Sequence, residues 1–393
     1  MSNMNWKGTC LIGFAIFLGV FGALQADHML RSHGAPKEAD LLIPAPPPAV
    51  LPVGLDQQSD TGPLDFRVAA KKVIPSVVSV DRYEEMVDFF GNQTNQVRET
   101  ATGSGVIVNK DGVVITNNHV VADPNGNPVQ EVKVRLNDKR SFKAKVIGTD
   151  PRSDIAVLKI TGTDFAPITM GRSDELQIGQ WVMAVGNPLG FDDTVSVGVV
   201  SSLKRDLPLQ SGGIVDAIQT DAAINPGNSG GALTDQHGNL VGINAAIASS
   251  NGGSVGIGFA IPIDRVREVA DDIIKFGHAR YGSLGVSYWQ NADGALGDAE
   301  VRQYIAEQTG TTPEAVPTSG IIIHGAGGPA EEAGLKPLDV LESVDGSPVD
   351  TYFALNRALI SKKPGDKVQI KWWSKGSVKT ASVALQEAGG QID

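Results

Sequence analysis

Short apolar runs separated by Gly, Pro and Asp recur from about residue 64 to about residue 276, and this pattern constrains the fold more than any other feature. In "GVIVNKDGVVITNNHVV" two such runs are joined by Lys110-Asp111-Gly112, which indicates a β-hairpin. The 46 glycines also favour turns and short strands over long helices. The pattern predicts an all-β sandwich or barrel, closed by one helix over residues 263–276 that stops at Gly277.

The chain is too long for one compact domain, because its 393 residues exceed the usual size of a single core. After residue 279, helical spacing in "AEVRQYIAEQ" and "TYFALNRALISK" alternates with strands such as "GIIIHG" and "KVQIKWW". We predict a second, small α+β domain over residues 279–386. The tail over residues 387–393 is expected to be disordered.

The N-terminus contains an uncharged segment over residues 8–26. As a helix it would be roughly 28 Å long, about the thickness of the hydrocarbon core of a bilayer. Cleavage after Ala26 would place Leu24 where a signal peptide needs a small residue, so residues 1–30 are expected to form an uncleaved transmembrane anchor, with a cleaved signal as the alternative. Residues 31–63 are rich in proline and predict an extended linker with no packed core.

Charge and cysteine content exclude several classes of function. The net charge of −11 argues against nucleic acid as a partner. Cys10 is the single cysteine, so neither a disulfide nor a cysteine metal site can form within the chain. Because the histidines lack partners at metal-ligand spacing, we predict neither a metal nor a cofactor.

The segment "NPGNSGGAL" over residues 225–233 places Ser229 among small residues. Such a pattern is compatible with an ordinary turn and with a reactive serine in a tight loop. A serine nucleophile needs a histidine base and an orienting carboxylate. In the β-rich region His237 lies in the polar turn "TDQHGN", whereas His119 ends an apolar strand in "VVITNNHVV". Asp154 opens the strand of "PRSDIAVLKI". Taken alone, His119 reads as a core residue and Asp154 as a turn residue, but their order with Ser229 is that of the chymotrypsin-type arrangement.

Five sequence blocks extend this pattern. "TNNHV", "SDIAVLKI" and "GNSGGAL" resemble the catalytic blocks of the HtrA (Deg) family of trypsin-like serine proteases, and "TGSGVIV" and "GIGFAIP" resemble two further blocks. The resemblance implies a chymotrypsin-like double β-barrel protease domain over residues 64–276. It also implies that Ser229 is the nucleophile, His119 the general base and Asp154 the orienting carboxylate. The N–H groups of Gly227 and Ser229 would bind the oxyanion.

The resemblance also suggests a substrate pocket and a mode of control. Ala223 stands where a protease specific for Lys or Arg needs Asp, and the pocket walls map to Ile224 and Ile247, so small aliphatic side chains are expected before the cleaved bond. Asn228 is neutral and cannot pair with a new N-terminus, so we expect activation by loop rearrangement. The stretch over residues 83–101 is either a regulatory loop or a plain surface loop.

In the second predicted domain, "YGSLGVSYW" and "GPAEEAGLKPLDVLESVDGSPV" resemble a PDZ domain of the HtrA type. PDZ domains bind a C-terminal peptide as an added strand. The resemblance implies that backbone N–H groups of Leu284, Gly285 and Val286 receive the terminal carboxylate. Leu338 stands where the family usually has Gly. The segment over residues 291–317 is longer than a minimal PDZ domain needs, and the sequence leaves open whether it covers the peptide groove.

Together these features predict a mainly β protein, a serine endopeptidase tethered to the inner membrane on its periplasmic or another extracytoplasmic face. The resemblance implies that it cuts misfolded or signalling proteins, that peptides at the PDZ domain regulate it, and that it forms a homotrimer through Phe66. The alternative is a catalytically silent peptide-binding scaffold or chaperone, and the presence of His119, Asp154 and Ser229 argues against it.

Overall fold

The computed structural model describes residues 42–44, 65–87, 93–188, 193–209, 212–245, 256–289 and 293–388. The expected anchor over residues 1–30 lies outside these described ranges. Within them, no helix combines the length and the apolar character needed to cross a membrane.

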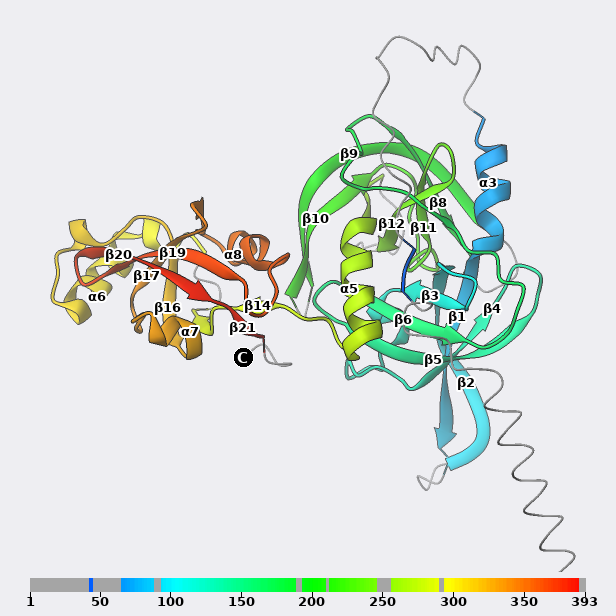
Figure 1. The fold of residues 1–393 in the computed structure, drawn as a ribbon, viewed down its shortest axis with the longest axis horizontal. Helices are drawn as coiled ribbons and strands as arrows, with labels where there is room; N and C mark the ends of the chain where they lie inside the picture. Colours follow the sequence, from blue (N-terminus) through cyan, green and yellow to red (C-terminus); the bar gives the residue numbers. More distant parts are fainter. Residues whose placement is uncertain are drawn as a thin grey trace, which may run out of the picture. The chain divides into compact units, whose positions relative to one another are not determined.

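Six strands of the N-terminal domain close into an antiparallel barrel in the order β1-β2-β3-β6-β5-β4 (Figure 1). They are β1 (Val77–Val87), β2 (Gln93–Ile107), β3 (Val113–Thr116), β4 (Glu131–Arg135), β5 (Ser141–Asp150) and β6 (Ile155–Ile160). Alternation places Val132 and Val134 of β4 in the barrel core, whereas Glu131 is exposed. Strand β6 is buried almost throughout, as its apolar sequence predicts.

A second sheet follows in the order β11-β8-β9-β10-β13-β12-β7. Its strands are β7 (Thr169–Met170), β8 (Trp181–Gly186), β9 (Thr194–Leu209), β10 (Gly212–Thr220), β11 (Ala232–Asp235), β12 (Asn239–Ala245) and β13 (Gly258–Pro262). Because β11 also pairs with β12, six of these strands form a ring and β7 is added at its side. The N-terminal domain is therefore a double barrel, as the sequence predicts.

Helix α5 (Ile263–Phe276) lies against strands of both barrels, β5 and β6 of the first and β12 and β13 of the second. Its buried side chains recur at helical spacing, from Ile263 through Val266 to Ile273. The helix ends where predicted, because Gly277 adopts φ +81° and its N–H caps Ile273 O. In the described ranges two shorter helices precede it: α3 (Arg67–Val73), which the 3-10 turn η1 (Ile74–Ser76) follows, and α4 (Asn118–Val121).

The described residues depart from the sequence expectations at two places in this domain. Strands β1 and β2 continue to pair beyond the barrel, from Tyr83↔Glu99 to Val87↔Gln93, so the backbone there forms a hairpin arm instead of the expected loop (Figure 1). Ile43 of the expected linker is only 5% exposed, and its N–H donates to Asp271 Oδ1 of α5 at 3.3 Å. The linker expectation is therefore wrong at Ile43, because an apolar side chain is packed there.

The C-terminal domain is built on a sheet in the order β15-β16-β17-β19-β20, with β18 paired to β17 and a separate β14–β21 pair. Its elements are β14 (Gly282–Ser283), β15 (Val286–Tyr288), η3 (Ala295–Gly297), α6 (Ala299–Thr309), η4 (Pro313–Ala315), β16 (Ile321–Ala326), α7 (Gly328–Glu332), β17 (Val340–Val344), β18 (Ser347–Pro348), α8 (Tyr352–Leu359), β19 (Lys367–Ser374), β20 (Ser377–Ala384) and β21 (Gln386–Glu387). This is a small α+β domain, as the sequence predicts.

The two faces of this sheet carry separate hydrophobic cores. Leu341 and its cross-strand neighbour Trp372 belong to the core that includes α8, whereas Val340 and its neighbour Trp373 belong to a second core with Ile305 of α6. Successive strand residues point to opposite faces, so the long segment before β16 covers the face away from α8. The segment's length is thus explained by a second core.

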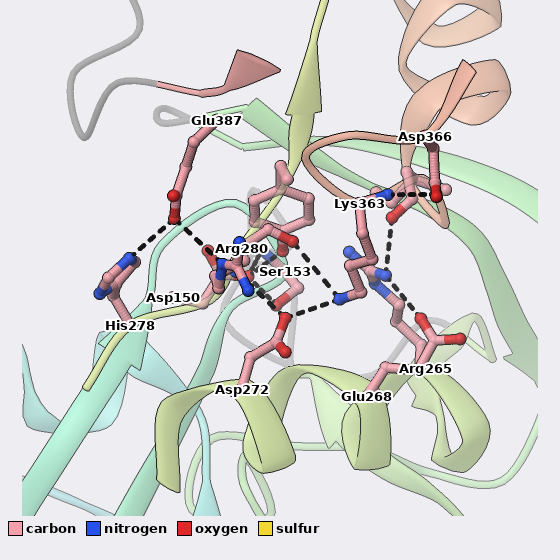
Figure 2. A network of polar contacts seen from close by, with 12 residues as sticks. Asp150, Ser153, Arg265, Glu268, Asp272, His278, Arg280, Lys363, Asp366 and Glu387 are labelled. Atoms are coloured by element: carbon pink, nitrogen blue, oxygen red, sulfur yellow. Dashed lines mark hydrogen bonds and ion pairs between the residues drawn. The ribbon is translucent and has the colours of Figure 1, made fainter. Parts of the chain in front are cut away.

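The end of the C-terminal domain packs against the junction between the two domains. Residues Gln386 and Glu387 pair with β14, so the expectation of a disordered tail is wrong at Glu387. Glu387 contacts His278 at 3.1 Å and Arg280 at 3.3 Å, and Lys363 reaches Asp272 of α5 at 2.6 Å (Figure 2). The junction is thus a network of charged groups on both sides of the connecting segment.

Candidate active site

His119 and Asp154 meet at the end of the first barrel, although 35 residues separate them. His119 lies in α4, just after β3, and its Nδ1 is 2.8 Å from Asp154 Oδ2. The Asp154 side chain is 8% exposed, whereas that of His119 is 47% exposed. A buried carboxylate thus holds one ring nitrogen, and an accessible imidazole is left to act through the other.

The backbone around both residues fixes this pair. The His119 N–H donates to Asp154 Oδ1 at 3.0 Å, and Asp154 O accepts from the Asn118 N–H at 3.1 Å and from Asn117 Nδ2 at 2.9 Å. Asp154 adopts φ +57°, a left-handed conformation that Asp tolerates better than most residues. Both the side chain and the main chain of Asp154 are therefore held against residues 117–119.

The environment of His119 shifts its pKa in a direction that matters for catalysis. Burial lowers the pKa of His119, but the hydrogen bond and the negative charge of Asp154 together outweigh burial and raise it above its ordinary value. A raised pKa makes the ring a stronger base. Since Asp154 accepts a hydrogen bond from the Nδ1–H of His119, the basic lone pair of the ring lies on Nε2.

Ser229 lies in the loop between β10 and β11, next to a tight turn. The Asn228 N–H donates to Asn225 O at 3.0 Å, and Gly227 adopts φ +100°. With Pro226 before Gly227, this is the signature of a type II turn, which needs a residue without a Cβ at its third position. A Cβ on Gly227 would also lie 2.4 Å from Pro188 Cβ. The turn thus fixes the backbone just before Ser229.

The Ser229 loop is tied to the barrel that carries His119. The Ser104 N–H donates to Ser229 O at 2.8 Å, and Ser104 Oγ donates to Gly227 O at 2.6 Å. A Cβ on Gly230 would lie 2.1 Å from Ser104 O and 2.3 Å from Thr116 Oγ1, three residues before His119. The structure therefore brings the Ser229 loop and the His119–Asp154 pair to the same end of the first barrel.

The predicted pocket residues lie beside this loop where they are described. Ile224 is 6% exposed and belongs to the core of the second barrel. Asn228 is 1% exposed, and its Nδ2 donates to Ala223 O at 3.5 Å. Ile247 lies outside the described residues. Ile224 is thus a buried side chain of the second barrel, and Asn228 supports the turn from inside.

The predicted carboxylate loop of the C-terminal domain lies at the start of β15. Gly285 adopts φ +74°, and its N–H donates to Ser283 Oγ at 3.0 Å. Leu284 is 1% exposed and belongs to the core, and Val286 begins the edge strand β15. Leu338, where the resemblance expects Gly, has φ +69°, the left-handed conformation that Gly adopts without strain.

Sequence reasoning missed two residues of these sites. Ser104 joins the Ser229 loop to the barrel, and its only sequence signal was its place in the "TGSGVIV" block. Arg152 lines a groove of the C-terminal domain, and no local pattern pointed to it. In the described ranges, no group of three or more His, Cys, Asp or Glu side chains is placed to hold a metal ion.

Family models agree with this geometry. The model of the trypsin-like peptidase domain matches residues 103–243, and the model of the PDZ domain matches residues 282–385. The fold and the site thus define a trypsin-like peptidase domain joined to a PDZ domain. The periplasmic pH-dependent serine endoprotease DegQ of Escherichia coli strain K12 is 37% identical over 346 residues, which cover 84% of this chain and 72% of that protein. The chain belongs to the HtrA (Deg) family of trypsin-like serine proteases.

Other relatives support the same assignment. A probable periplasmic serine endoprotease, DegP-like, of Pseudomonas fulva strain 12-X is 41% identical over 75% of this chain, and the chain spans 58% of that relative's length. The DegP-like protein of Hahella chejuensis is 36% identical, with 82% of this chain and 70% of that protein covered. The solved structure of the HtrA-type protease AlgW with a decapeptide matches with a TM-score of 0.65 at 33% identity, covering 83% of this chain and 99% of that one.

Proposed function

We propose that this chain is a serine endopeptidase that cleaves peptide bonds through an acyl-enzyme intermediate. The observation that carries the proposal is the 2.8 Å contact between His119 Nδ1 and the buried Asp154 carboxylate, at the barrel end to which the Ser229 loop is tied. Such an arrangement supplies a nucleophile, a base and an orienting group. The resident side chains suffice for this chemistry.

In the proposed mechanism, Ser229 Oγ attacks the scissile carbonyl carbon while His119 Nε2 takes the hydroxyl proton. The imidazolium gives that proton to the leaving amine as the C–N bond breaks, which leaves an ester on Ser229. Water then attacks the ester while His119 takes a proton from it. The bond between the acyl carbon and Ser229 Oγ breaks, the imidazolium returns the proton to Ser229 Oγ, and the carboxylic acid product leaves. Asp154 stabilises the cationic ring in both steps, and its hydrogen bond keeps the ring in the required orientation.

We further propose that the N–H groups of Gly227 and Ser229 stabilise the oxyanion. The turn that requires φ +100° at Gly227 supports this role, because it fixes the direction of the backbone groups before Ser229. Loss of one such donor typically costs about 3 kcal/mol of transition-state stabilisation. Ala223, Ile224 and Ile247 give an uncharged pocket in this proposal, which favours small aliphatic side chains.

The PDZ domain is proposed to bind the C-terminus of a peptide and to regulate cleavage. Strand β15 is at the edge of its sheet, which is the geometry needed to add a peptide strand. The proposed substrates are unfolded or signalling proteins. The relatives are named as periplasmic endoproteases, which supports a periplasmic location for this chain. The uncharged segment over residues 8–26 supports the proposal of an N-terminal membrane anchor.

We also propose a homotrimer with Phe66 at the contact between subunits. The Phe66 ring lies 6.3 Å from that of Trp181, which is 40% exposed, and Val68 nearby along the chain is 78% exposed. Exposed apolar side chains gathered in this way favour association. Light scattering after gel filtration should give three times the chain mass for the wild type and a smaller species for Phe66→Ala. An unchanged mass would remove Phe66 from the interface.

A fluorophosphonate probe and casein digestion test the enzymatic proposal. The full chain should be labelled at Ser229 and should digest casein, whereas Ser229→Ala should do neither. Equal digestion by both proteins would refute Ser229 as the nucleophile. If the folded wild type takes no label even with a PDZ-binding peptide present, the silent scaffold is the better description.

A further inference from the structure

One side chain of the peptidase domain lines the groove of the PDZ domain. The groove has a volume of about 410 Å³ and lies between β15 and α8, with Leu284, Val286, Leu355 and Leu359 among its apolar walls. Arg152, from the loop between β5 and β6, is also part of its wall. Among the described lining residues Arg152 is the one with a formal charge. The groove is therefore lined by uncharged side chains apart from a guanidinium that the other domain provides.

Arg152 is held in place by neutral groups. Its Nη2 donates to Asn356 Oδ1 of α8 at 2.9 Å, and its guanidinium lies 4.6 Å from the centre of the Tyr281 ring. Tyr281 is 6% exposed, and its hydroxyl donates to the Asp150 carboxylate. Asp150 also accepts from the Ser153 N–H at 3.1 Å. The loop that carries Arg152 is thus fixed at both sides of the residue.

The positive charge of Arg152 has no carboxylate partner in the described part of the chain. No ion pair joins it to Asp or Glu there, and its Nε is buried with no acceptor. By contrast, Arg357 on the same helix α8 pairs with Asp206 at 2.6 Å and with Asp216 at 3.2 Å. A guanidinium that lines a groove and has no carboxylate partner can take a carboxylate of a ligand as its acceptor.

We infer that Arg152 binds a carboxylate of the peptide in the PDZ groove, so that the peptidase domain supplies the charged part of the peptide site. This inference rests on the proposed peptide binding by the PDZ domain. The Gly285 N–H is already bonded to Ser283 Oγ, which leaves fewer backbone donors for an anion at the start of β15. The planar fork of Arg matches a carboxylate with two parallel hydrogen bonds. The carboxylate comes either from the peptide terminus or from an acidic side chain near it.

The same loop connects the groove to the candidate active site. Arg152 faces the groove, and Asp154, two residues later, holds His119. The two residues thus belong to one short segment that contributes one side chain to each site. In this inference Arg152 gives the groove its selectivity for peptides that carry a carboxylate.

A binding experiment tests the inference without relying on catalysis. Fluorescein-labelled octapeptides with free C-termini, randomised at the last three positions, are screened by anisotropy against the full chain carrying Ser229→Ala. The tightest peptide is then remade as its C-terminal amide and with any acidic side chain changed to the matching amide. These two forms show which carboxylate Arg152 binds.

In the same background, Arg152→Gln should weaken the tightest free-acid peptide by about tenfold, the typical effect of losing a hydrogen bond between charged groups. Arg152→Lys should lose less, because it keeps the charge without the fork. The peptide form that lacks the relevant carboxylate should bind weakly to the protein that retains Arg152. Its affinity should not change further in the Arg152→Gln variant. Circular dichroism and an unchanged melting temperature would show that the variants are folded.

Arg357→Gln is the matched control, because Arg357 lies on α8 and joins the two domains but does not line the groove. This variant should bind the peptide within about twofold of the affinity of the protein that retains Arg357, because a partly exposed ion pair contributes little free energy. Equal losses in Arg152→Gln and Arg357→Gln would mean that Arg152 only docks the domains, and would overturn the inference. The inference would also be overturned if the Arg152→Gln variant bound every peptide form with the same affinity as the protein that retains Arg152. A screen in which no peptide binds would overturn it as well.

Discussion

The candidate active site and the PDZ groove are built in different ways from the same loop. The active site draws His119, Asp154 and the Ser229 loop from one domain, and main-chain and side-chain hydrogen bonds from residues 104 and 117–119 fix it. The groove takes its apolar walls from the PDZ domain and its charge from Arg152 of the other domain. A site within one double barrel is fixed as that domain folds, whereas the charged wall of the groove depends on how two domains pack.

Loss of the Asp154 charge tests the independence of the two sites most strongly. Asp154→Asn should reduce kcat by about 10⁴-fold, as replacing the orienting carboxylate of a serine triad does, because the ring loses its correct tautomer. Peptide affinity at the groove should stay unchanged, measured by the anisotropy assay described above. A comparable loss of peptide affinity would show that the two sites are one coupled unit.

The pH dependence of cleavage sharpens the same contrast. His119 must be neutral to accept a proton, and Asp154 raises its pKa after burial lowers it, so kcat/KM should rise with pH through a pKa above that of an ordinary histidine. In Asp154→Asn the lowering by burial remains and the raising is lost, so the residual activity should reach its plateau at a lower pH. Stopped assays on a short chromogenic peptide across the pH range measure both curves. If kcat/KM rises over the same pH range in both proteins, Asp154 does not set the pKa of His119.

Gly230→Ala tests whether packing between the barrels fixes the Ser229 loop. The added Cβ would meet Ser104 O at 2.1 Å, and Gly230 has φ +82°, which disfavours any residue with a Cβ. Strain and overpacking together should lower the free energy of unfolding by about 3 kcal/mol. Urea denaturation measures this change, and Gly126→Ala is the control, since it shares a positive φ of +86° but has open space around it. Equal losses in both variants would remove the packing argument.

Asn356→Ala should have the smallest effect, and only on the groove. Asn356 is 3% exposed and accepts from Arg152, so its loss frees the guanidinium without removing the charge. We expect a loss of peptide affinity of about threefold to tenfold, the range for one hydrogen bond, and no change in the fluorophosphonate labelling rate without peptide. A change in that basal rate would mean that Asn356 acts on the active site as well.

Much of this architecture could be predicted from local sequence patterns. Alternating apolar runs predicted the barrels, and helical spacing with Gly277 predicted the end of α5. The sequence blocks around His119, Asp154 and Ser229 predicted the candidate catalytic residues, because a reactive serine needs a base and an orienting carboxylate. The expectations failed where long-range packing decides, as at Ile43, which is buried against α5, and at Glu387, which pairs with β14.

The sequence by itself determined the residue types of the candidate triad, the strand pattern and the two-domain order, since each depends on residues within one short segment. Only the tertiary structure decided that the segment before β16 forms a second core behind the PDZ sheet and that Arg152 enters the peptide groove. Arg152 and its partner Asn356 are 204 residues apart, and their contact depends on the packing of two separately folded cores. Periodicity records which face of an element is buried, but it does not record which distant surface covers that face.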